Sequence, residues 1–70
     1  MNEDILKGQW KQLKGEIRNQ WGKLTDDEVD QVNGEFEKLV GRIQERYGRT
    51  REEARSEVEE YMQRHSMRTY

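Results

Sequence analysis

Residues 8–22 read GQWKQLKGEIRNQWG, and residues 34–48 read GEFEKLVGRIQERYG. The second stretch repeats the first at an offset of 26 residues, and seven positions are identical or exchange one aromatic residue for another. A duplicated motif usually marks a duplicated supersecondary unit. We therefore predict two units, about residues 8–33 and 34–64, related by a pseudo-two-fold axis. The matched pairs are Gly8 and Gly34, Trp10 and Phe36, Leu13 and Leu39, Gly15 and Gly41, Ile17 and Ile43, Trp21 and Tyr47, and Gly22 and Gly48.

The apolar residues recur at steps of three and four, which is the spacing of one face of an α-helix. No useful length of chain alternates with period two, so we predict an all-α protein without strands. Three stripes are present, and together with Val40 and Met62 they make up the predicted core. The stripes are Leu6, Trp10, Leu13, Ile17, Trp21 and Leu24; Val29, Val32, Phe36, Leu39, Ile43 and Tyr47; and Ala54, Val58 and Tyr61.

Helix ends are marked chemically at the repeat spacing. Gly22 and Gly48 each follow an aromatic residue and are typical of left-handed glycine caps. The segments 25–28 (TDDE) and 50–53 (TREE) are both capping boxes, which begin helices. Asn33-Gly34 interrupts an otherwise continuous stripe and is a poor helix interior, so we predict a break there.

These boundaries give a fold of four helices, at about residues 3–21, 26–33, 35–47 and 51–64. They are predicted to form a small bundle of two packed αα-hairpins, with fraying at residues 66–70. The whole chain, residues 1–70, makes one domain. Since only 30% of its residues are hydrophobic, we expect a free energy of unfolding of about 3–5 kcal/mol at most.

The composition excludes several classes of protein. The chain has no cysteine, no long apolar segment and an acidic start at Met1–Asp4, so we expect a cytoplasmic protein that neither spans a membrane nor carries a signal peptide. The single histidine, His65, has no second ligand for a metal and no nucleophile to serve. The acidic run 26–30 lacks the glycine of a calcium loop and is interpreted as a charged first helical turn. We therefore expect no enzyme activity, metal or cofactor.

Two features remain as candidates for function. A basic stripe on the first helix, made of Lys7, Lys11, Lys14 and Arg18, is a candidate interaction surface. A protein partner or self-association fits it better than nucleic acid, because the pI is about 5.4 and acidic blocks follow directly. Gly15 and Gly41 lie nearly opposite their apolar stripes, and an interior helix glycine costs about 1 kcal/mol relative to alanine. We therefore hypothesise that the first and third helices cross closely at these two glycines.

Three segments, 10–15 (WKQLKG), 21–27 (WGKLTDD) and 39–48 (LVGRIQERYG), closely resemble the CsbD-like family of small bacterial proteins. The resemblance covers roughly residues 1–62, whereas Ile5-Leu6 and residues 66–70 depart from the family pattern. It implies a SAM-domain-like pair of helical hairpins and a cytoplasmic bacterial protein induced under general stress. No catalytic or binding residues come with the resemblance. The favoured function is thus a non-enzymatic stress-associated protein, and the alternative is a protein-interaction module.

Overall fold

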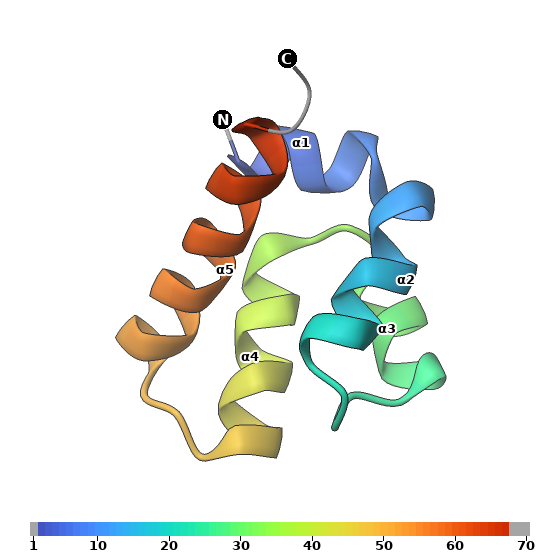
Figure 1. Cartoon of the computed structure of the whole chain (residues 1–70). Helices are drawn as coiled ribbons and strands as arrows, with labels where there is room; N and C mark the ends of the chain where they lie inside the picture. Colours follow the sequence, from blue (N-terminus) through green and yellow to red (C-terminus); the bar gives the residue numbers. More distant parts are fainter. Residues whose placement is uncertain (1, 68–70) are drawn as a thin grey trace.

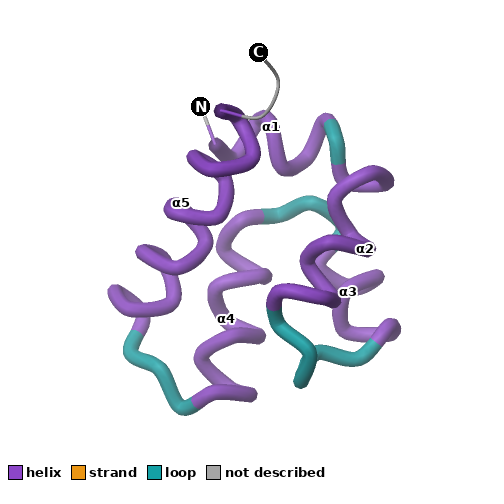
Figure 2. Tube along the Cα trace, viewed as in Figure 1, coloured by secondary structure: helices purple, strands orange, loops and turns teal. Residues whose placement is uncertain are grey.

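The computed structural model describes residues 2–67 and contains five helices, with no strand in that range. Figures 1 and 2 show helices joined by short loops, which confirms the all-α prediction. The helices are α1 (Asn2–Gly8), α2 (Trp10–Gln20), α3 (Asp26–Val32), α4 (Phe36–Tyr47) and α5 (Arg51–Met67).

Helices α4 and α5 lie side by side, and α3 contacts both α2 and α4 (Figure 1). The short helix α1 lies across one end of the molecule, where it contacts α2, α4 and α5. The first helix of the chain therefore joins the α2 side of the bundle to the α4–α5 side.

The prediction of a single helix over residues 3–21 is wrong, because the chain bends at Gln9 and divides it into α1 and α2. Gln9 has φ −113° and ψ 21°, outside the helical values of its neighbours. The bend has a tertiary cause. It directs α1 onto α4 and α5, where the side chain of Leu6 is completely buried.

Most helix-end predictions are confirmed. In both capping boxes the Glu backbone N–H donates to the Thr hydroxyl, at 3.2 Å for Thr25 and 3.1 Å for Thr50. The predicted break after α3 is present, with Asn33 at φ 49° and Gly34 at φ 80°, both left-handed. Gly48, at φ 64°, caps α4 as predicted.

The predicted left-handed cap at Gly22 is wrong. Trp21 itself ends α2 with φ −121° and ψ 78°, and Gly22 is not among the described residues with positive φ. In this non-helical conformation the Trp21 ring packs edge-on against Tyr61, with 5.5 Å between ring centroids. The long-range ring contact accompanies a different helix end from the one that the local sequence favours.

Helix α5 ends later than predicted. It continues to Met67, so the expected fraying is wrong for Ser66 and Met67. No proline or glycine follows Gly48, so nothing in the sequence stops the helix earlier. Residues 68–70, and the side chain of His65, lie outside the described residues.

The predicted core is confirmed except at Tyr47, which is only partly buried. The Tyr47 hydroxyl accepts a hydrogen bond of 3.1 Å from the backbone N–H of Lys23, so its polar end stays at the surface. The other predicted core residues are all buried: Leu6, Trp10, Leu13, Ile17, Trp21, Leu24, Val29, Val32, Phe36, Leu39, Val40, Ile43, Ala54, Val58, Tyr61 and Met62.

Candidate functional site

The predicted basic surface is divided by the structure. Lys7 lies on α1, whereas Lys11, Lys14 and Arg18 lie on α2. The Lys14 Nζ atom is 2.9 Å from an Asp30 carboxylate oxygen, and Arg18 pairs with Asp26. Both acids belong to α3, so the second half of the basic stripe holds α2 against α3. The side chains of Lys14 and Arg18 are therefore engaged in ion pairs within the chain.

Lys7 and Lys11 form the other half of the stripe. Both side chains are exposed, and within residues 4–64 neither makes an ion pair. They border a shallow depression at the bend between α1 and α2, which Gln12 and Asn33 also line. The part of the predicted surface that is free to meet a partner is therefore the pair Lys7 and Lys11.

The acidic residues of α3 point to different partners. Asp26 pairs with Arg18, Asp30 pairs with Lys14, and Glu28 turns the other way toward α4. The three carboxylates thus take part in separate helix contacts. The macrodipole of α3 also favours Asp26 and Glu28, because they lie in its first turn.

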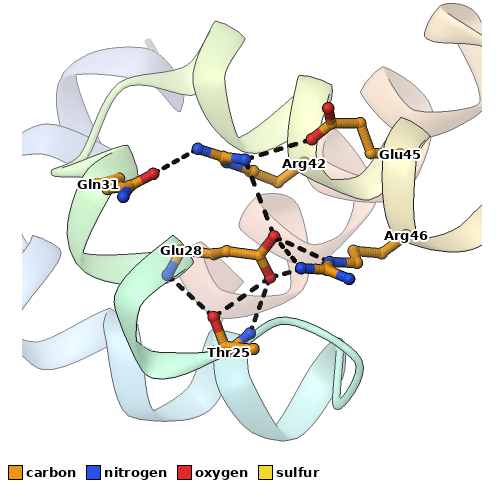
Figure 3. A network of polar contacts seen from close by, with 6 residues as sticks. All are labelled: Thr25, Glu28, Gln31, Arg42, Glu45 and Arg46. Atoms are coloured by element: carbon orange, nitrogen blue, oxygen red, sulfur yellow. Dashed lines mark hydrogen bonds and ion pairs between the residues drawn. The ribbon is translucent and has the colours of Figure 1, made fainter.

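Glu28 is the buried charged side chain of the described residues, with 8% of its surface exposed, and it is the centre of a polar network (Figure 3). The Arg46 Nε atom donates to both Glu28 carboxylate oxygens, at 3.0 and 2.8 Å, and Arg46 Nη2 lies 2.6 Å from Oε2. The Thr25 backbone N–H donates to Glu28 Oε1 at 3.0 Å. One carboxylate therefore completes the cap of α3 and ties α3 to α4.

Arg42 extends this network one turn along α4. Its Nη1 atom lies 3.8 Å from Glu28 Oε2 and 3.3 Å from Glu45 Oε1 (Figure 3). Its Nη2 atom donates to the side-chain oxygen of Gln31 on α3. Arg42 and Arg46 are four residues apart and so lie on one face of α4.

The network fixes the protonation state of Glu28. The hydrogen bond from Arg46, and then the one from the Thr25 backbone, lower the pKa of Glu28 from 4.5 to about 2. The same hydrogen bond raises the pKa of Arg46. A general acid or base works best with a pKa near the operating pH, so Glu28 is poorly suited to proton transfer near neutrality. Its chemistry is that of a permanent carboxylate holding two helices together.

A second cluster joins the end of α2 to α5. The Trp21 indole N–H donates to Glu57 Oε1 at 3.2 Å, and Arg49 Nε lies 2.6 Å from Glu57 Oε2. The Lys23 Nζ atom lies 5.2 Å from the centre of the Tyr47 ring, within the range of a cation–π interaction. The sequence analysis missed this cluster because its members are far apart in the chain.

The predicted close crossing at Gly15 and Gly41 is wrong. A Cβ atom built on either glycine meets no other heavy atom within 4 Å. The tight glycine is Gly34, where a Cβ atom would lie 2.9 Å from the Lys7 Cα atom and 3.4 Å from Trp10 Cβ. The close backbone approach therefore lies where α1 passes over the turn between α3 and α4, and the matching glycine of the repeat, Gly8, has no such neighbour.

These observations define a small, hydrophilic, all-helical protein whose buried carboxylate and paired charges hold its helices together. The chain belongs to the CsbD-like family, whose model matches residues 4–56. It is 48% identical over 68 residues to the UPF0337 protein YjbJ of Escherichia coli, covering 97% of this chain and 99% of the relative.

Two further relatives are UPF0337 proteins of other bacteria. The one from Pseudomonas aeruginosa is 50% identical over 64 residues, which is 91% of this chain and 98% of the relative. The one from Bordetella pertussis is 52% identical over 64 residues, which is 91% of this chain and 97% of the relative. These relatives confirm the resemblance that the repeat motifs carry.

No solved structure matches the chain. Among the described helices, none combines the length and the apolar character needed to cross a membrane.

Proposed function

We propose that this protein is a non-enzymatic component of the bacterial general stress response that protects other proteins through its charged, hydrated surface. The observation that supports this proposal is the complete use of Glu28 by Thr25 and Arg46. This buried carboxylate holds α3 against α4, and its lowered pKa suits it poorly to proton transfer near neutrality. What the molecule offers to its surroundings is its surface, and the 13 basic and 15 acidic residues of the chain nearly cancel in charge.

Such a surface is suited to protection at high concentration. Charged side chains of both signs keep a small domain soluble. Lysine and glutamate side chains also present hydrogen-bond donors and acceptors to a neighbour that is losing water. The protective effect therefore depends on the amount of surface and not on one particular residue.

The test is preservation of a labile enzyme, such as a dehydrogenase, through drying or freezing with the protein present at stoichiometric amounts. We expect more recovered activity than with an inert protein of equal size. The variant Lys7→Glu/Lys11→Glu should protect equally well, because those two side chains support no structural contact. Protection no better than that of the inert protein refutes the proposal.

A second function, a protein-interaction module, is favoured by one observation, the exposed pair Lys7 and Lys11, which makes no ion pair within residues 4–64. Charge reversal at these two residues should then abolish a defined complex while the circular dichroism spectrum stays unchanged. Weak binding of nucleic acid by the same lysines is less favoured, and a gel shift that survives about 150 mM salt would be needed to support it.

The finer architecture and the cellular location form part of the same proposal. The contacts of α2 with α3 and of α4 with α5 support two hairpins in a SAM-domain-like, pseudo-two-fold arrangement, to which α1 is added. A cytoplasmic location is supported by the absence of cysteine from the sequence.

A further inference from the structure

Of the side chains described for helix α1, two pack against the rest of the chain. Leu6 is completely buried against the core, and Ile5 is partly buried. Among the side chains described for α1, neither Asp4 nor Lys7 makes a hydrogen bond or ion pair. Among its described residues, α1 thus docks on α4 and α5 through apolar contact and through the close approach to Gly34.

The joint at Gln9 is almost helical. The Gln9 N–H donates to the Ile5 carbonyl at 2.9 Å, and the Leu13 N–H donates to the Gln9 carbonyl at 2.9 Å, as in an uninterrupted α-helix. Trp10 and Lys11 are the first two residues of α2, so their N–H groups lie outside the hydrogen-bond ladder of that helix, as at any helix start. In a straight helix these two groups would donate to the carbonyls of Leu6 and Lys7.

Within one chain, this segment cannot both form a continuous helix and bury Leu6 in its own core. A straight helix over α1 and α2 would complete the backbone hydrogen bonds and continue the apolar stripe Leu6, Trp10, Leu13. It would also withdraw Leu6 from its own core and leave the surface under α1 open. A bent chain buries Leu6 but begins a new helix at Trp10, which leaves the N–H groups of Trp10 and Lys11 outside the ladder of α2.

We propose that a second copy of the chain resolves this conflict by exchange of α1. In the exchanged dimer, α1 and α2 form one continuous helix in each copy, and each α1 docks on α4 and α5 of the other. The partner fits because the docking surface and the helix that fills it are the same in both copies. Exchange of one element between identical chains is a low-cost route to a symmetric dimer.

The residue at position 9 shifts the equilibrium between the bent monomer and the exchanged dimer. Two substitutions at this position therefore make a matched pair of variants. Alanine stabilises a helix interior and glycine destabilises it, and each dimer contains two joints. After refolding at high protein concentration, Gln9→Ala should dimerise at least about tenfold more strongly than Gln9→Gly, as measured by analytical ultracentrifugation. If Gln9→Ala stays monomeric, or if the two variants dimerise equally, the proposal is overturned.

A cross-link identifies which segments meet in the dimer, because the natural chain has no cysteine. Lys7 and Asn33 border the same depression, one on α1 and the other on the turn that α1 covers. Equal amounts of Lys7→Cys and Asn33→Cys chains are refolded together in the Gln9→Ala background. A short bis-maleimide should then join the two introduced thiols between chains. A dimer that yields no such link contradicts the exchange of α1.

Gly34→Ala serves as the second control. The added Cβ atom would clash with α1 whether α1 comes from the same chain or from the other. The variant should therefore lose the dimer, even though it releases α1 from its own chain. A dimer that persists in Gly34→Ala would show that association uses another surface and would overturn the exchange.

Discussion

Replacing Gly34 by alanine should destabilise the protein much more than the same replacement at Gly48. Both glycines are left-handed, with φ of 80° and 64°. Forcing alanine into this conformation costs about 1–2 kcal/mol at either site. Of the two, only Gly34 brings the new Cβ atom against a backbone atom, Lys7 Cα at 2.9 Å. Because backbone cannot rotate away as a side chain can, α1 has to move off the turn.

The additional cost follows from what α1 buries. Losing the burial of Leu6 removes about 1.5–3 kcal/mol, so Gly34→Ala should destabilise by about 2.5–5 kcal/mol in total. Gly48→Ala should cost only about 1–2 kcal/mol. Urea denaturation followed by far-ultraviolet circular dichroism measures both free energies of unfolding.

A double-mutant cycle tests the physical reason. Leu6→Ala alone should cost about 2–5 kcal/mol, since it empties the same contact. If Gly34→Ala acts by displacing α1, the double variant Leu6→Ala/Gly34→Ala should lose clearly less than the sum of the two single losses. Equal destabilisation by the two glycine variants, or additive losses in the cycle, would refute the reasoning.

Three further predictions concern the helix interiors and the caps. Gly15→Ala and Gly41→Ala should each stabilise the protein by about 1 kcal/mol and raise Tm by about 4–8 °C, because no other part of the fold lies near the added Cβ atom. A fall in Tm for either variant contradicts the open geometry. The pKa values of Glu28 and Glu53 are lowered, so both carboxylates stabilise the fold above pH 4.5, and this stabilisation is lost as the pH falls, for Glu28 toward about 2. Carboxyl titration by NMR should find Glu28 among the most acidic groups, and a Glu28 pKa near 4.5 contradicts the network. Thr50→Ala should lower the free energy of unfolding by about 1 kcal/mol, whereas Thr50→Ser should lower it almost not at all, because serine keeps the capping hydroxyl. Equal losses in the two variants would contradict the cap.

The parts of the fold that depend on local chemistry could be predicted from the sequence. Thr25 and Thr50 lie three residues before a glutamate, and both form the capping box that this spacing favours. Asn33-Gly34 breaks the helix because both residues adopt left-handed conformations with little strain. The core followed from helical spacing alone, because the stripes leave few other apolar residues to bury.

The bend at Gln9 could not be predicted, since glutamine is a good helix former and the apolar stripe runs through it. The bend depends on the docking of Leu6 against helices distant in the sequence. The same limit applies to the candidate site. The spacing of Lys14 and Arg18 was visible, but only the placement of α3 shows that Asp30 and Asp26 occupy them.

Cross-linking in living, stressed bacteria tests the central claim most directly, namely that the protein acts through its whole surface. The cross-linked products would be separated and identified by mass spectrometry, with the Lys7→Glu/Lys11→Glu variant as a control. Apart from the chain's own dimer, we predict a diffuse set of many partners that is the same for both proteins. One dominant foreign partner, lost in the variant, would contradict the account and identify an interaction module instead.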